Sequence, residues 1–256
     1  MTYGGIDIGS RYIKFVLISE NSEIVNIEKI DTGFSPLKSA LELVKSYDLK
    51  TYFATGYGRH LLEIHDNAKT ITEIKACATG SSNLFPECKA IIDIGGQDTK
   101  VITMNNKGKV INFLMNDKCA AGTGKFIEMM TNSLAMELAD FSRLSDNDYN
   151  PKIKINSMCA VFAESEVISL ITRGFDRREI ASAIHHSVAD KVISLALKLD
   201  ILEKEIVFTG GCARNKYLVS ILEERLGKSL NVSNPPDILS AYGAAIIAKD
   251  SCESTF

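Results

Sequence analysis

The 256-residue chain lacks several features that mark large classes of proteins. No run of Lys or Arg stands out and the net charge is -3, which argues against a general nucleic-acid or acidic-membrane surface. No apolar stretch approaches the ~20 residues that a membrane-spanning helix needs. Met1 is followed at once by a strand pattern, without a basic flank and an apolar core, so we expect no secretory signal peptide.

Cysteine is scarce too, with six residues and no CxxC pair. A chain of this size does not need a disulfide framework, so we predict reduced thiols and a cytoplasmic location. Lone cysteines in such proteins are mostly small, buried apolar residues. With 45% hydrophobic and 24% charged residues, the composition is that of a soluble globular protein with an ample core.

The Gly-rich segment "CAAGTGKF", residues 119–126, invites comparison with a nucleotide-binding loop. The Walker A motif requires a Gly, four residues, and then Gly-Lys-Ser/Thr. Here the first Gly would be Cys119, and Phe126 replaces the hydroxyl residue. The segment is therefore not a Walker A motif, and Cys119, between an apolar run and a predicted helix, needs another explanation.

The chain contains an internal duplication. "IDIGSRYIKFVLI" and "IDIGGQDTKVITM" lie 86 residues apart, and each predicts a strand, a tight Gly turn and a second strand. A third strand and a helix follow in both copies. At this offset the chemically distinctive matches are Asp7 with Asp93, Gly9 with Gly95, and Lys14 with Lys100.

The remaining pattern is helical, apart from the strand "EIVFTGG". Ser35 and Pro36 are typical of a helix start, and the matching helix of the second copy is predicted to begin near Ala120. The later helices are predicted at 163–172, 177–199, 214–226 and 238–248. We therefore predict an α/β fold with two related domains, 1–88 and 89–237, with the segment 238–256 returning to the first.

The two Gly turns have the chemistry of phosphate-binding loops. Backbone N–H groups without bulky side chains can bind phosphate oxygens, and a strand-end Asp can hold the hydrated Mg²⁺ that bridges phosphates. A single turn of this kind is also common in hairpins, so the pair at a fixed offset is the stronger indication. The strand that ends at Gly210 and Gly211 would let an adenosine approach the backbone.

The order of these segments resembles the superfamily of actin, sugar kinases and heat-shock chaperone ATPases. This resemblance implies two duplicated ribonuclease H-like domains with ATP in the interdomain cleft. It assigns Mg²⁺ contact, or orientation of the attacking water, to the candidate catalytic residues Asp7, Asp93, Gln97 and Asp98. It assigns nucleotide binding to Gly9, Ser10, Lys14, Gly95, Gly96, Gly122, Gly124, Lys125, Glu164, Gly210, Gly211 and Asn215, although Lys125 and Glu164 equally suit structural roles.

A narrower resemblance is carried by "TGYGR", "IIDIGGQDTKV", "NFLMNDKCAAGTGKF" and "CAVFAESEVIS". These motifs are similar to those of the activators of 2-hydroxyacyl-CoA dehydratases, a family that includes the ATPase subunits of benzoyl-CoA reductase. In that family one [4Fe–4S] cluster lies between two identical subunits, and the matching residues are Cys119 and Cys159. A four-iron cluster binds four thiolates, so a twofold dimer would complete the set, with each cysteine at the start of a helix whose N-terminus favours an anion.

The family resemblance implies ATP-driven electron transfer. Reduced ferredoxin or flavodoxin would load an oxygen-sensitive cluster, and ATP hydrolysis would drive one electron to an iron–sulfur partner. The partner stays open between a 2-hydroxyacyl-CoA dehydratase, a benzoyl-CoA reductase and a double-cubane cluster protein. Two residues depart from the family pattern: Cys77 stands where a His is usual, and Arg11 where a Thr is more frequent.

Two other functions fit the same superfold. A small-molecule kinase would use Asp98 as its catalytic carboxylate but would leave Cys119 and Cys159 unexplained. An actin-like or chaperone-like switch would only assemble with partners. Adjacent His185 and His186 cannot face one site on a helix, so we predict that they lie on a solvated face.

Overall fold

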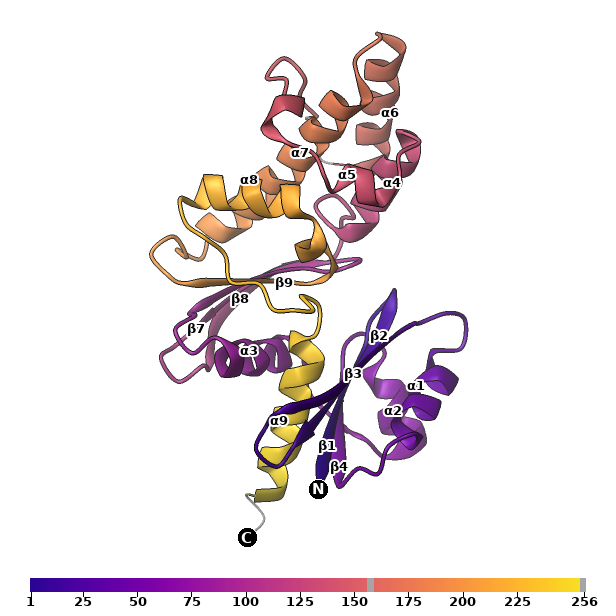
Figure 1. Cartoon of the computed structure of the whole chain (residues 1–256), viewed down its shortest axis with the longest axis vertical. Coiled ribbons are helices and arrows are strands. Elements are labelled where there is room, and N and C mark those ends of the chain that lie inside the picture. Colours follow the sequence, from indigo (N-terminus) through magenta and orange to yellow (C-terminus); the bar gives the residue numbers. More distant parts are fainter. Residues whose placement is uncertain (156–158, 254–256) are drawn as a thin grey trace. The chain divides into compact units, whose positions relative to one another are not determined.

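The computed structural model describes residues 1–155 and 159–253. The chain divides into two compact units (Figure 1). Unit 1 comprises residues 1–91, 102–112 and 233–256, and unit 2 comprises residues 92–101 and 113–232. No helix in the described ranges is long and apolar enough to cross a membrane.

A five-stranded sheet in unit 1 has the order β3-β2-β1-β4-β5. Its strands are β1 Thr2–Ile8, β2 Tyr12–Ser19, β3 Ile24–Asp31, β4 Thr51–Thr55 and β5 Lys69–Thr70. β2 pairs antiparallel with β1 and β3, whereas β4 pairs parallel with β1 and β5. In this register Asp7 lies opposite Lys14, which brings the acid and the base of the first copy together.

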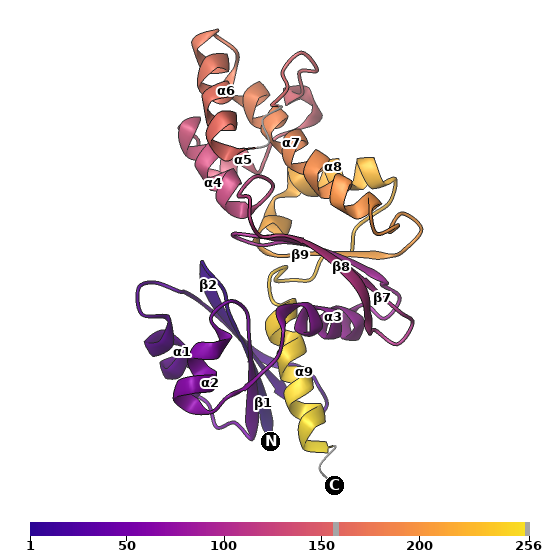
Figure 2. The same cartoon turned by 180° about the vertical axis from the view of Figure 1, so that it is seen from behind.

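Helices cover both faces of this sheet (Figures 1 and 2). They are α1 Pro36–Lys45, α2 Arg59–Asp66 and α9 Leu239–Glu253, and α3 Glu73–Leu84 packs against α9. Because successive strand residues point to opposite faces, Phe15 packs in one core with Val44 of α1 and Leu62 of α2. Val16 packs in the other core with Ala241 of α9, so the last helix returns to the first sheet.

A second, four-stranded sheet has the order β8-β7-β6-β9. Its strands are β6 Ala90–Ile94, β7 Thr99–Met104, β8 Val110–Asn116 and β9 Ile206–Thr209. The helices of unit 2 are α4 Gly124–Ser133, α5 Leu138–Phe141, α6 Ala160–Thr172, α7 Arg177–Leu197 and α8 Lys216–Leu226, with short 3₁₀ turns at Asp146–Asp148 and Gly211–Arg214. Within unit 2, α4, α6 and α7 pack together and α8 lies against α7.

The predicted helices are confirmed with small shifts in their ends, apart from one. α1 begins at Pro36 after Ser35, as the sequence indicates. The helix predicted near Ala120 instead begins at Gly124. Gly122 has φ +90°, which a right-handed helix cannot accommodate, and the Thr123 N–H closes a turn onto the Ala120 carbonyl at 3.0 Å. Besides the short 3₁₀ turns, five elements were not predicted from the sequence: β4, α2, β5, α3 and α5.

Candidate functional site

Each of the two Gly turns is closed by an equivalent backbone hydrogen bond. The Gly9 N–H donates to the Tyr12 carbonyl at 3.1 Å, and the Gly95 N–H donates to the Asp98 carbonyl at 2.9 Å. Both partners are related by the 86-residue offset of the sequence repeat. The duplication is therefore present in the geometry of the turns as well as in their residues.

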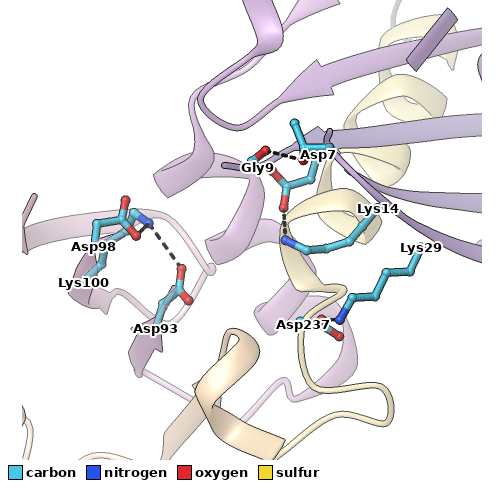
Figure 3. A network of polar contacts seen from close by, with 9 residues as sticks. Asp7, Gly9, Lys14, Lys29, Asp93, Asp98, Lys100 and Asp237 are labelled. Atoms are coloured by element: carbon cyan, nitrogen blue, oxygen red, sulfur yellow. Dashed lines mark hydrogen bonds and ion pairs between the residues drawn. The ribbon is translucent and has the colours of Figure 1, made fainter. Parts of the chain in front are cut away.

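In the first turn, Asp7 and Lys14 form a buried ion pair (Figure 3). The Lys14 Nζ lies 2.7 Å from Asp7 Oδ2, and the Asp7 side chain is only 4% exposed. Burial alone would lower the pKa of Lys14, but the attraction of Asp7 raises this pKa above its ordinary value. Asp7 Oδ1 is buried without a hydrogen-bond partner in the described part of the chain, so one carboxylate oxygen stays available to a ligand.

The second turn has one cation for two carboxylates (Figure 3). The Lys100 Nζ lies 2.8 Å from Asp98 Oδ1 and 3.6 Å from Asp93 Oδ2. The Lys100 side chain is 2% exposed, and Asp93 is buried as well. Counting these three side chains, the second turn carries one negative charge more than the pair in the first turn.

The remaining predicted residues of the turns face solvent. Gln97 is exposed at the tip of the second turn. Ser10 is exposed in the first turn and, with Arg11, lines a surface hollow. The hollow is completed by Asp31, Gly33 and Phe34.

A Thr-Gly pair ends one further strand in each copy, and this correspondence was not predicted. Gly56 follows β4 with φ +84°, and a Cβ added there would lie 2.2 Å from Asp7 Oδ1. Gly210 follows β9 with φ +89°, and its added Cβ would lie 2.5 Å from Asp93 Oδ1. Only glycine combines this conformation with such close approach. The repeated signal, "FATG" and "VFTG", is visible in the sequence.

The start of α4 is joined to the second turn. The Gly124 N–H donates to the Gly95 carbonyl at 2.9 Å, and the Lys125 N–H donates to the Gly96 carbonyl at 2.8 Å. The Lys125 side chain is exposed and lies 3.6 Å from Glu128. Four of the predicted nucleotide-binding residues thus come together: Gly95, Gly96, Gly124 and Lys125.

Asn215 is held as part of a buried network. Its Oδ1 caps α8 by accepting from the Leu218 N–H at 3.0 Å, and its Nδ2 lies 2.8 Å from His185 Nε2. The His185 Nδ1 lies 2.7 Å from the Ala181 carbonyl, so Nδ1 donates and Nε2 accepts. The prediction that His185 lies on a solvated face is wrong, because this side chain is 1% exposed and stacks on Phe141. Burial lowers the pKa of His185 to about 4.

Glu164 lies away from the second turn. Its Oε1 accepts a hydrogen bond from the hydroxyl of Ser133 at 2.9 Å. Ser133 ends α4 and Gly124 begins it, so the two positions are about 13 Å apart along the helix. The structure thus gives Glu164 a bridging contact between α4 and α6.

The cysteines differ sharply in exposure. Cys159 is exposed and is the N-cap residue of α6, as predicted. Cys119 is partly exposed, but it lies in the turn before α4 and not at the helix start. Cys77, Cys88 and Cys212 are buried. Burial, with Asp93 and Glu128 nearby, raises the pKa of Cys212 to about 12, so this thiol stays protonated as a packing residue.

Lys191 of α7, which was not predicted as a site residue, interacts electrostatically with Cys119 and Cys159. Its Nζ is buried and has no hydrogen-bond partner among the residues that the structure describes. Burial lowers the pKa of Lys191, while electrostatic interaction with Cys119 and Cys159 acts in the opposite direction. A buried unpaired ammonium is costly, so this position suits an anionic group.

The described residues of a single chain do not form a complete metal site. In residues 1–155 and 159–253, no three His, Cys, Asp or Glu side chains are grouped closely enough to hold a metal ion. Two accessible cysteines beside a buried cation nevertheless have the donor chemistry of half an iron–sulfur site, since such clusters are anionic and bind thiolates.

Solved structures define the fold class. A ROK family glucokinase from Streptomyces griseus aligns with 98% of this chain and all of its own, with a TM-score of 0.63 and 10% identity. The (R)-2-hydroxyglutaryl-CoA dehydratase component A from Acidaminococcus fermentans aligns with a TM-score of 0.89 and 39% identity over 99% of both chains. The chain therefore has the α/β, actin-like ATPase fold, as the sequence predicts.

The chain belongs to the BadF/BadG/BcrA/BcrD ATPase family, whose model matches residues 5–248. It is 42% identical over 253 residues to the (R)-2-hydroxyglutaryl-CoA dehydratase activating ATPase of Acidaminococcus fermentans, covering 95% of each chain. It also aligns with the 2-hydroxyisocaproyl-CoA dehydratase activator from Clostridium difficile with bound ADPNP, at 37% identity and a TM-score of 0.89, over 100% of this chain and 97% of that one. The family resemblance seen in the motifs is confirmed.

Proposed function

We propose that this chain is an ATP-dependent electron-transfer protein. It hydrolyses ATP to drive one electron from a [4Fe–4S] cluster, bridging a homodimer, to an iron–sulfur partner such as a 2-hydroxyacyl-CoA dehydratase. The relatives support the partner class, because two are named as activators of such dehydratases. The observation that carries the cluster assignment is the buried, unpaired Lys191 ammonium beside Cys119 and Cys159.

We assign ATP and Mg²⁺ binding to the two Gly turns and to the segments bonded to them. The unpartnered Asp7 Oδ1 is suited to accept from a water of hydrated Mg²⁺, which usually keeps several of its waters. Asp93 and Asp98, tied to Lys100, are suited to the same role or to holding the attacking water. The ADPNP-bound relative supports nucleotide binding by this chain.

We assign cluster binding to Cys119 and Cys159, two thiolates from each of two chains. When bound, the cluster supplies a one-electron carrier at low potential. Cys159 stands at the N-terminus of the 13-residue helix α6, where the helix dipole favours the negative charge of its thiolate. Reduced ferredoxin or flavodoxin is the proposed donor, and a cytoplasmic location would keep the thiols reduced.

We also propose that the chain consists of two ribonuclease H-like domains, residues 1–88 with 238–256, and residues 89–237. The shared turn geometry supports this division: each copy has the same Gly hydrogen bond, and each has a Thr-Gly pair against its strand-end Asp. The packing of α9 with β1 and β2 supports the return of the last segment.

A kinase function is less well supported. Kinases share the fold, but the carboxylate that would act as base, Asp98, is ion-paired with buried Lys100 at 2.8 Å. The kinase assignment also leaves Cys119 and Cys159 without a role.

The deciding experiment measures iron and acid-labile sulfide on anaerobically prepared protein. We expect four irons per dimer, lost in Cys119→Ser and in Cys159→Ser while ATP binding persists. Cys252→Ser, a partly exposed cysteine on α9, is the matched control and should keep the iron. A wild-type protein that binds ATP but no iron under these conditions would refute the proposal and favour the kinase function.

A further inference from the structure

We infer that Lys191 sets the reduction potential of the cluster, by placing a buried positive charge beside its thiolate ligands. The inference rests on the proposed function and goes beyond it, because it names a residue that binds neither iron nor nucleotide. Lys191 lies on α7, far in sequence from both cysteines. Its role would come from charge alone.

The stem of Lys191 lies against the turn that follows Cys119. A Cβ added at Gly122 would lie 3.5 Å from the Lys191 Cβ and 3.6 Å from its Cδ. The side chain therefore runs along the segment that begins at Cys119 and ends at α4. An added Cβ at position 122 would thus be in ordinary van der Waals contact with the Lys191 side chain.

The end of the side chain is held in place without being neutralised. The Lys191 Nζ lies 5.4 Å from the centroid of the Phe126 ring, within cation–π range. Phe126 is itself buried in α4. In the described part of the chain no hydrogen-bond acceptor contacts this Nζ, whereas both cysteines act on it electrostatically.

Two other lysines with buried or partly buried side chains show what is unusual about the Lys191 ammonium. Lys14 and Lys100 are each ion-paired with carboxylates at 2.7 and 2.8 Å. A lysine is rarely buried unless it is paired. Lys191 is different: within the described residues its ammonium has no hydrogen-bond partner, and Cys119 and Cys159 act on it electrostatically, so its proposed partner is the group that those cysteines hold.

A fixed cation favours the more negative of two redox states. One-electron reduction adds one negative charge to the cluster and breaks no bond, the electron coming from the low-potential donor proposed above. A cation in a water-poor site stabilises that added charge more strongly than an exposed one does. Lys191 should therefore raise the midpoint potential and ease loading by the donor.

The test is an anaerobic redox titration of the iron-loaded dimer, followed by electron paramagnetic resonance. Lys191→Met should lower the midpoint potential by about 59 mV, the shift that corresponds to a tenfold change for a one-electron couple. Lys191→Arg keeps the charge and should stay near wild type. Lys118→Met removes an equal charge from an exposed side chain next to Cys119 and is the matched control, with a much smaller shift expected.

The outcomes separate the inference from the function on which it rests. Wild-type protein without iron refutes the proposed function before any potential is measured. A fully loaded Lys191→Met dimer with an unchanged potential overturns the role of Lys191 alone, as does a Lys118→Met shift of equal size. Should Lys191→Met fail to hold iron, Lys191→Arg decides: a loaded dimer at the wild-type potential supports the inference, and a lowered potential overturns it.

Discussion

The two copies of the Gly turn differ in how their charges are balanced. In the first, Lys14 is 18% exposed and pairs with Asp7, whose second oxygen has no hydrogen-bond partner in the described residues. In the second, Lys100 is 2% exposed and bridges Asp93 and Asp98. One difference between the two copies accounts for the second carboxylate: position 98 is Asp where the first copy has Tyr12.

This difference shows that the Gly residue fixes the backbone of each turn, while the side chain three residues later fixes the charge of the turn. The matching Gly hydrogen bond survives in both turns because it needs only a carbonyl three residues later. The charge of each turn depends on the side chain at that later position. We propose that the first turn offers a free carboxylate oxygen and the second an excess negative charge.

The largest effect should come from removing the bridging cation of the second turn. Lys100→Met removes the buried cation that pairs with Asp93 and Asp98 and should lower the free energy of unfolding by about 3–5 kcal/mol. Lys14→Met removes one charged hydrogen bond from a more accessible pair and should cost about 2 kcal/mol. Urea unfolding of both variants measures the comparison, and equal losses would show that the second carboxylate adds nothing.

The segments after the two Thr-Gly pairs should differ in their response to pH. α8 is capped by Asn215, which His185 holds in place, whereas α2 begins after Gly58 without a side-chain cap. The pKa of His185 is lowered to about 4 from an ordinary 6.5, so between these values the unfolded chain binds the extra proton. The stability that neutral His185 contributes is therefore fully present above about pH 6.5 and is lost as the pH falls toward 4.

The full loss from His185 should reach about 3 kcal/mol, from the size of that shift. His185→Gln replaces the titrating ring by a neutral amide, so its unfolding free energy should fall less steeply across this range, whatever its stability at pH 7. Unfolding in urea at pH 7, 6, 5 and 4.5 gives both profiles. Parallel profiles for the variant and the wild type would exclude His185 as the source.

The smallest effect concerns the two Thr-Gly pairs. Gly56→Ala and Gly210→Ala should each cost about 2 kcal/mol more than Gly33→Ala, because the new Cβ meets backbone and carboxylate atoms. Gly33 is the matched control: its φ is +58°, but an added Cβ meets nothing within 4 Å. Thermal unfolding of the three variants measures the difference. If all three lose the same stability, the close approach to Asp7 and Asp93 is unimportant.

Much of the site could be predicted from the sequence because its signals are local. A Gly turn with a strand-end Asp is specified by a few adjacent residues, and the 86-residue offset made the pair recognisable. The same holds for Cys159, which directly precedes the helical pattern of α6. The family motifs predicted the fold class for the same reason, since they are long and contiguous.

The misjudged positions depend on contacts between distant segments. Nothing near His185 in the sequence shows that the side-chain amide of Asn215, 30 residues later, donates a hydrogen bond to the buried His185 ring. The start of α4 was missed because Gly122 adopts φ +90° where its carbonyl accepts from the Thr99 hydroxyl, 23 residues earlier. The pairing of Gly56 with Asp7 likewise required the parallel alignment of β4 with β1.

The sequence by itself determined the two turns, most of the longer helices and the family, because each is encoded by residues close together along the chain. Only the tertiary structure decided which charges are compensated. Lys14, Lys100 and Lys191 look alike in the sequence, yet two of them meet carboxylates and the third lies buried beside two cysteines. The cost of burying a charge depends on what else is brought to the same place, and that is settled only when the chain has folded.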